Sequence, residues 1–121
     1  MHEMSIAVAL IEQVVEVAER HHATRVESID LTVGEMRHVI PDAMDQAFRA
    51  ASHGTVVAGA TLNLTFEPAA AQCGSCDGRY QPVDFDFCCP HCGAADARIV
   101  AGDDIVLQSV ECDAPVPGAT P

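Results

Sequence analysis

Four cysteines in two pairs are the residues of this sequence whose types and spacing most clearly predict chemistry. Cys73 and Cys76 are separated by two residues, twelve residues follow, and Cys89 and Cys92 repeat the same spacing. Each pair lets two thiolates reach one ion from a single tight turn, and four sulfur ligands form the closed tetrahedral set of structural zinc. The pattern therefore predicts a zinc site. The alternatives are an iron centre of the rubredoxin type, a disulfide pair or a redox-active pair.

The two remaining cysteines are not expected to bind the metal. Cys88 directly precedes Cys89, but its spacing to Cys92 leaves three intervening residues, so Cys89 forms the better pair. Cys112 lies near the end of an expected strand and is interpreted as a plain thiol. No base can be placed beside either thiol, and no catalytic group of nucleophile, base and orienting residue emerges from the spacing. The sequence therefore predicts a protein that is not an enzyme.

The charge of the chain argues against a nucleic-acid partner, although many zinc ribbons bind one. The 121 residues carry a formal net charge of −12 and include no lysine. The cysteine-rich stretch itself holds Asp77, Asp84 and Asp86 against Arg79. Binding to phosphates requires Lys and Arg, so nucleic acid is excluded as a partner. A negative surface is compatible instead with cations or with a basic protein surface.

The sequence also predicts where the protein works. It contains no run of eighteen apolar residues, and its first residues lack the basic and then apolar pattern of a signal peptide. Six cysteines arranged around metal-binding pairs fit a reducing compartment better than a secreted disulfide scaffold. We therefore expect a cytoplasmic protein without a membrane span.

Hydrophobic periodicity places these residues on two helices and a small sheet. A helix is predicted over 5–22, where Ser5 is a candidate cap and the exposed His21 and His22 close the last turn. A second helix is predicted from Pro41 to Gly54. The expected buried residues of the two helices are Ile6, Leu10, Val14, Val17 and Ala18, and Met44, Ala47, Phe48 and Ala51, respectively. Alternating residues predict strands over 25–34, around Leu62, Leu64 and Phe66, and over 104–111.

These elements predict an α+β fold in which two helices pack on a small mixed or antiparallel sheet, with an inserted zinc-ribbon lobe. The helix-containing domain is expected to span 1–70 and to be completed by a return strand within 99–112. The zinc-ribbon lobe is expected at 71–98. Three prolines in nine residues predict a disordered tail over 113–121.

The first three residues, Met1-His2-Glu3, form a second group with metal chemistry, here called the terminal motif. The Met1 amine, the His2 amide nitrogen and the His2 imidazole can close adjacent chelate rings on one ion. Nitrogen ligands in a tetragonal plane are those that Ni(II) and Cu(II) prefer. Methionine is normally removed only before small residues, so Met1 is expected to remain. Taken alone, the motif is better explained as an ordinary solvated terminus, because any protein can carry His at its second position.

In combination, these features resemble the HypA family of nickel metallochaperones for hydrogenase and, in some organisms, urease maturation. The resemblance rests on a Met-His-Glu-Met-Ser start that runs into an amphipathic helix and on the four paired cysteines. Two weaker matches are Val33-Gly34-Glu35 and Ser52-His53-Gly54-Thr55. The resemblance covers about residues 1 to 112.

The resemblance implies a nickel carrier. It assigns nickel to His2, assisted by the Met1 amine and by Glu3, and structural zinc to the four cysteines. It also implies a HypB-type GTPase partner and delivery of Ni(II) to the large subunit of [NiFe] hydrogenase. The chain departs from some members at 93–95, where Gly-Ala-Ala replaces a histidine that can join the nickel shell. His91 lies within the second pair and could substitute for that ligand, but the expectation is that it faces solvent.

Two functions of other classes compete with this interpretation. One is a zinc-ribbon protein-interaction module whose N-terminus binds no nickel, and the other is a rubredoxin-like electron carrier. The chain contains no Gly-rich phosphate-binding loop, so nucleotide hydrolysis would belong to a partner.

Overall fold

The computed structural model describes residues 2–84 and 86–113, apart from the side chain of His2. The expected disordered tail therefore lies outside the described residues, except for Asp113. No helix in this part of the chain is long and apolar enough to cross a bilayer.

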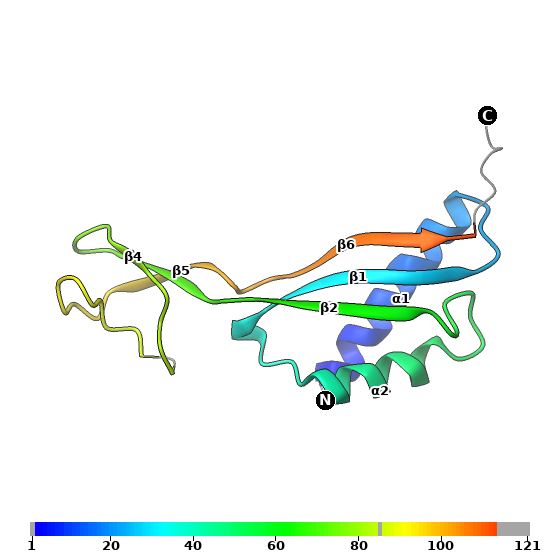
Figure 1. The fold of residues 1–121 in the computed structure, drawn as a ribbon, viewed down its shortest axis with the longest axis horizontal. Helices are drawn as coiled ribbons and strands as arrows, with labels where there is room; N and C mark the ends of the chain where they lie inside the picture. Colours follow the sequence, from blue (N-terminus) through cyan, green and yellow to red (C-terminus); the bar gives the residue numbers. More distant parts are fainter. Residues whose placement is uncertain (1, 85, 114–121) are drawn as a thin grey trace. The chain divides into compact units, whose positions relative to one another are not determined.

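Between residues 2 and 113, the described part of the chain folds into two helices and two three-stranded sheets (Figure 1). Their bounds are α1 His2–Arg20, β1 Val26–Gly34, a 3-10 turn Glu35–Arg37, α2 Pro41–Ser52, β2 Thr61–Glu67, β3 Ala70–Cys73, β4 Arg79–Tyr80, β5 Ala97–Ala101 and β6 Ile105–Cys112. The predicted α+β class is confirmed. The second sheet, with the order β4-β3-β5, lies between β2 and β6 in the chain.

The first sheet has the strand order β2-β1-β6 and is mixed. Contacts between β1 and β6 run in opposite directions, since Ser28 bonds Glu111 and Asp30 bonds Ser109. Strands β1 and β2 are parallel, because the residue numbers of their contacts rise together. Asn63 donates to Asp30, and just beyond the strands Ala69 donates to Glu35. Helix α2 therefore belongs to a β1-α2-β2 crossover, the connection that a parallel pair requires.

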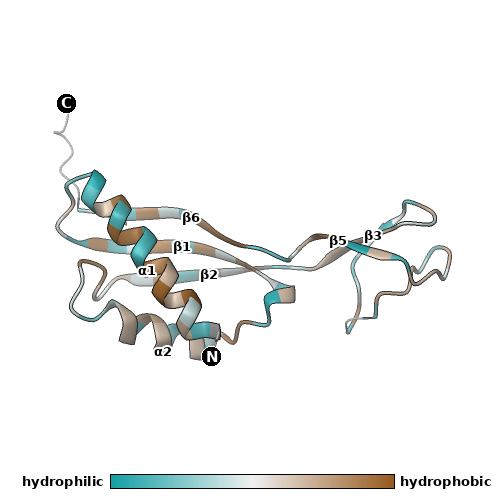
Figure 2. Cartoon of the chain, turned by 180° about the vertical axis from the view of Figure 1, so that it is seen from behind, coloured by the Kyte–Doolittle hydropathy of each residue, from teal (hydrophilic) through white to brown (hydrophobic). Residues whose placement is uncertain are grey.

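Described residues group into two compact units. The helix–sheet unit comprises those within 1–31, 39–64 and 107–121, and the cysteine unit comprises 32–38 and 65–106. The domain bounds predicted from the sequence stay a prediction. In the helix–sheet unit, α1 and α2 pack together and α1 lies over one face of the sheet (Figures 1 and 2). Its largest fully buried side chains are Val14, Val26, Ile29, Met44, Phe48 and Val57.

Helix α1 differs from its prediction at both ends. It begins at His2, so Ser5 lies inside the helix and does not cap it. It ends at Arg20 because His22 adopts a left-handed backbone with φ 56°. The Ala23 N–H donates to the Ala18 carbonyl and the His22 N–H to the Glu19 carbonyl, which is the Schellman arrangement that closes a helix.

The buried faces of the helices are also shifted slightly from the expected ones. Ala7 and Ile11 are buried in α1 in place of Ile6 and Val17, which are half-buried. Three of the four predicted core residues of α2 are buried, but Ser52 takes the place expected for Ala51. A periodicity locates the apolar side of a helix within about one residue, and the packing partner decides which flank is covered.

Two glycines, Gly34 and Gly102, allow close backbone packing within the cysteine unit. A Cβ atom on Gly34 would lie 2.3 Å from the carbonyl carbon and oxygen of Gly102. Hydrogen bonds join the same segments, because the Met36 N–H donates to the Gly102 carbonyl and the Ala69 N–H to Glu35 Oε1 at 2.8 Å. Gly34 and Glu35 of the Val33-Gly34-Glu35 match thus have structural roles within the cysteine unit.

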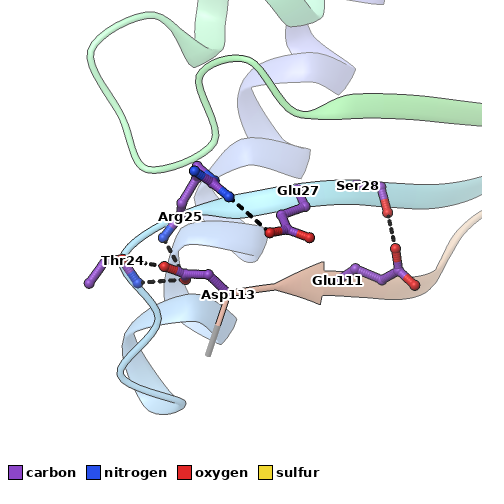
Figure 3. Close-up of polar contacts among 6 residues, drawn as sticks. All are labelled: Thr24, Arg25, Glu27, Ser28, Glu111 and Asp113. Atoms are coloured by element: carbon purple, nitrogen blue, oxygen red, sulfur yellow. Dashed lines mark hydrogen bonds and ion pairs between the residues drawn. The ribbon is translucent and has the colours of Figure 1, made fainter. Parts of the chain in front are cut away.

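Strand β6 is tied to the start of β1 by the side chain of Asp113 (Figure 3). Its carboxylate accepts hydrogen bonds from the backbone N–H groups of Thr24 and Arg25 and from the Thr24 hydroxyl. These donors lower the pKa of Asp113, with the Thr24 hydroxyl contributing most. Although the sequence assigned this residue to the tail, it belongs to the folded edge of the sheet.

Asp30 is expected to titrate below the usual range of an aspartate. The hydroxyl of Ser109 and the amide of Asn63 donate to its two carboxylate oxygens at 2.7 and 3.0 Å, and they lower its pKa from 3.8. Because the Asp30 carboxyl has a lower pKa in the folded chain than in the unfolded chain, its ionised form stabilises the fold at any pH above the unfolded-state pKa. This stabilisation is lost as the pH falls through the folded-state pKa. A carbon-detected NMR titration of the Asp30 carboxyl should give a midpoint below 3.8, which Ser109→Ala raises.

The neighbouring Ser28→Ala serves as the matched control for this titration. Ser28 donates to Glu111 instead of Asp30, at 2.7 Å, so its removal should leave the Asp30 midpoint unchanged. A midpoint at or above 3.8 in the unmodified chain would contradict the assigned hydrogen bonds.

Candidate metal centre

The four cysteines predicted from the sequence come together in the cysteine unit, here called the cysteine cluster. Their sulfur atoms all lie within 4.8 Å of one another. The Cys73 and Cys92 sulfurs are 3.6 Å apart, and the Cys76 and Cys89 sulfurs are 3.7 Å apart. Each close pair joins one cysteine from each turn, so the two turns face each other across a single point.

These distances fit a tetrahedral thiolate site. Four sulfurs placed about 2.3 Å from a central zinc are separated by about 3.8 Å along each tetrahedral edge. The observed separations are far longer than the roughly 2.05 Å of a disulfide bond, and all six cysteines are free. The cluster therefore holds a structural metal better than it forms a disulfide.

Backbone N–H groups donate hydrogen bonds to three of the four cluster sulfurs. The N–H groups of Ser75, Gly78 and His91 each donate to the cysteine sulfur two residues earlier, at 3.3 to 3.4 Å. Such donors favour the thiolate over the thiol. Both turns use the same arrangement, which follows from the two-residue spacing within each cysteine pair.

Hydrogen bonds and burial shift the pKa values of three thiols of the cluster, Cys76, Cys89 and Cys92. Burial alone would raise the pKa of Cys89, but the backbone N–H groups of Cys92 and His91 lower it to about 6. At Cys76 the Gly78 N–H acts to lower the pKa, but the neighbouring Cys89 and the remaining thiols raise it to about 12. A thiolate therefore forms more easily at Cys89 than at Cys76 or Cys92, and a bound cation would favour the thiolate form of those two residues.

The core that the described residues form around the cluster is small. Its buried members are Ala71, Cys73, Tyr80 and Cys89, with Ala94, Ala97 and Ile99 packed against them. The Tyr80 hydroxyl donates to the carbonyl of Phe87 and ties the long loop to β4. Because two of the four buried residues are themselves cluster cysteines, the apolar contacts alone provide little stabilisation.

Cys88 does not join the cluster. It is exposed, its N–H donates to Asp86 Oδ1 at 3.0 Å, and the same carboxylate raises the pKa of its thiol. Its neighbour Cys89 is buried among the other sulfurs, as the spacing predicted. Cys112 is half-buried on β6, where burial and then Asp113 and Glu27 raise the pKa of its thiol.

His91 is exposed, as expected, and its ring lies against the first cysteine turn. A Cβ atom on Gly78 would lie 2.7 Å from the His91 Cδ2 atom and 3.2 Å from the Cys76 sulfur. A side chain at position 78 would therefore collide with the imidazole of His91, which lies over the first cysteine turn. Spacing alone could not reveal this contact, because it joins the two turns.

The structure gives Glu3 a role that the sequence did not predict. Its side chain is 9% exposed, and its carboxylate accepts a hydrogen bond from the N–H of Ile40 at 3.2 Å. Ile40 is the N-cap residue of α2 and lacks a capping side chain of its own. Glu3 thus connects the first turn of α1 to the start of α2. Met1 and the side chain of His2 lie outside the described residues.

Other histidines do not form a competing site among the described residues. His21, His22 and His53 are exposed, and the cysteine cluster is the one group of three or more ligand side chains close enough to share an ion in that part of the chain. The adjacent pair at the end of α1 was expected to be solvated, and it is.

Comparison with known families gives a match over residues 1–112 to the HypA family, described as "Hydrogenase/urease nickel incorporation, metallochaperone, hypA". Among similar proteins is hydrogenase maturation factor HypA from Pelodictyon phaeoclathratiforme. It is 35% identical over 111 residues, which cover 91% of this chain and 94% of that protein. Hydrogenase maturation factor HybF from Klebsiella pneumoniae is 36% identical over 111 residues, with 92% and 98% covered.

Solved structures share the fold. The solution structure of a HypA protein aligns with a TM-score of 0.71 at 26% identity, covering 94% of this chain and 98% of that one. The solution structure of the Ni metallochaperone HypA from Helicobacter pylori aligns with a TM-score of 0.66 at 23% identity, covering 91% and 96%. The chain therefore belongs to the HypA family of hydrogenase/urease nickel-incorporation metallochaperones, and the prediction that it is not an enzyme is confirmed.

Proposed function

We propose that this chain carries Ni(II) on its terminal motif and delivers it during the maturation of [NiFe] hydrogenase. The observation that supports this most directly is the family match, which begins at residue 1 and so includes Met1-His2-Glu3. The amine of Met1, the amide nitrogen of His2 and the imidazole of His2 would supply nitrogen ligands to the cargo ion.

Glu3 would assist the site in one of two ways. A carboxylate can ligate nickel directly, but the Glu3 oxygen would first have to give up its hydrogen bond to Ile40. If that bond is kept, Glu3 instead holds the terminal motif beside the start of α2. The short distance in sequence between His2 and Glu3 is compatible with both roles.

Zinc is the ion that we assign to the cysteine cluster. Four thiolates at tetrahedral separations, with backbone N–H donors to three of the sulfurs, are the ligand set of a structural zinc site. In this role zinc would replace the missing apolar core of the cysteine unit. It would take no part in carrying nickel.

A HypB-type GTPase and the hydrogenase large subunit are the partners that we propose. The sequence has no phosphate-binding loop, so an energy-dependent step of delivery would need a separate nucleotide-binding protein. The six free cysteines support a reducing location, which we take to be the cytoplasm.

Nickel binding should depend on the free N-terminus. In a titration followed by absorption spectroscopy, the untagged chain should bind nickel, whereas a histidine-free N-terminal extension or His2→Ala should weaken binding at least tenfold. The extension converts the Met1 amine into a far less basic amide, and the substitution removes the imidazole. Affinity should also fall from pH 8 to pH 6, because an unperturbed α-amine and an unperturbed imidazole titrate at roughly 8 and 6.5, and nickel must displace these protons.

His53→Ala is the control, because this exposed histidine lies away from the terminal motif in the sequence and should leave nickel affinity unchanged. Unaltered affinity in both the extended chain and His2→Ala would overturn the terminal site. Zinc without nickel binding would instead indicate an interaction module, and a red iron-containing protein would indicate an electron carrier.

A further inference from the structure

An apolar groove runs between α1 and α2 within the helix–sheet unit. It has a volume of about 520 Å³ and is lined by Met4, Val8, Ile11 and Val15 of α1, with Ala50 and Ala51 of α2 opposite them. The α1 residues recur every three or four positions and so form one continuous stripe along the helix. Their stripe covers eleven residue steps, or about 16 Å of helix.

The groove is open although its walls are apolar. Met4 and Val8 are 40% and 42% exposed, and both belong to the few large apolar side chains that remain exposed among the described residues. Figure 2 shows that α1 carries apolar residues in the half nearer its N-terminus and hydrophilic residues toward its other end. Exposed apolar surface that is gathered into a groove is typical of an interaction site.

Charges around the groove restrict what can fill it. Glu12 lines the groove, and Glu16 and Glu19 follow it along the same helix. The one arginine of α2, Arg49, pairs with Asp45 at 3.0 Å. The carboxylates on α1 outnumber its one arginine, Arg20 in the last turn, and the chain has no lysine, so the flank formed by α1 is acidic on balance.

From these observations we propose that the groove between α1 and α2 binds an amphipathic helix from a protein partner, with an aliphatic ridge flanked by Lys and Arg. A helix about three to four turns long would lay its ridge along the Met4–Val15 stripe, and its basic flanks would face Glu12 and Glu16. A second copy of this chain is a poor occupant, because each copy carries a net charge of −12.

The inference does not depend on the proposed nickel site, since none of the groove residues is a proposed ligand. Synthetic peptides of about 14 residues, four helical turns, provide the probe. One peptide carries Leu at helical spacing with Lys on both flanks, a second replaces Lys by Glu, and a third scrambles the first. Binding of each labelled peptide to the full zinc-loaded chain is measured by fluorescence anisotropy.

Two matched substitutions test the site. Val8→Glu should weaken binding of the basic amphipathic peptide at least tenfold, whereas Val106→Glu, which adds the same charge at a valine of 44% exposure on β6, should change it less than twofold. Met4→Glu repeats the test at the other exposed groove residue. Circular dichroism should show unchanged helix content for all three, since each position is already open to solvent.

Each remaining outcome would overturn the proposal. Equal weakening by Val8→Glu and Val106→Glu, or equal binding of the scrambled peptide, would show attraction by net charge alone. Tighter binding of the peptide with Glu flanks than of the peptide with Lys flanks would contradict the proposal that the partner helix is basic. A dimer of the unmodified chain in analytical ultracentrifugation that Val8→Glu dissociates would assign the groove to a second copy.

Discussion

Cys89→Ser is expected to abolish zinc binding and to unfold the cysteine unit while the helix–sheet unit stays folded. Among the described residues, the buried core around the cluster consists of four, two of which are cluster cysteines, so these contacts provide little stability once the metal is lost. A structural zinc site can contribute on the order of 10 kcal/mol to the folding of a small module. Metal analysis would show loss of zinc, and limited proteolysis would show cleavage confined to the cysteine unit.

Cys88→Ser provides the matched control for this prediction. The two cysteines are adjacent, but Cys88 is exposed and lies outside the cluster, so its loss should keep one zinc per chain and the native protease resistance. If Cys88→Ser lost the zinc and Cys89→Ser kept it, the second pair would have to be reassigned by one residue.

Gly34→Ala should destabilise the protein by about 3 kcal/mol or more, as an overpacked site without room to relax does. Gly34 has φ −68°, an angle that alanine adopts readily, so a site with free space would gain about 0.4–1 kcal/mol from the substitution. The added Cβ would instead lie 2.3 Å from two backbone atoms of Gly102, which cannot rotate away as a side chain could. The sign of the change in unfolding free energy therefore shows whether the backbones at Gly34 and Gly102 pack closely.

Urea unfolding followed by circular dichroism measures this effect. Gly54→Ala is the comparison, because Gly54 has φ 78° and a Cβ atom added there would meet no other atom within 4 Å. Only backbone strain of about 1–2 kcal/mol should therefore appear. An increase in the urea midpoint for Gly34→Ala would show that Gly34 and Gly102 do not approach each other.

Local patterns in the sequence were sufficient for the helices, for the strands of the first sheet and for the cysteine cluster. Ile29, Leu31 and Val33 alternate in β1, and the spacing of the cysteines alone selected Cys89 over Cys88. These features depend on residues that are close in the chain or on ligands whose chemistry is specific. They are the features for which a sequence pattern has a direct physical cause.

The second sheet and several contacts could not be predicted in this way. Strands β3, β4 and β5 have two to five residues, and β3 reads Ala-Ala-Gln-Cys, which shows no clear alternation of apolar and polar residues. The bond from Glu3 to Ile40 joins residues 37 positions apart, and the approach of Gly34 to Gly102 joins segments that only the folded chain brings together. Such contacts are set by tertiary packing and leave no local signal.

The start of α1 at His2 has a consequence for how a metal could use the backbone there. In an α-helix, each N–H from the fifth residue onward is occupied by a carbonyl one turn earlier, whereas the first four have no partner in the helix. The amide nitrogen of His2 belongs to this unoccupied group. Deprotonating it for nickel would therefore break no bond of the helix, whereas the same histidine one turn further along would have to unwind the helix before its amide could become a ligand.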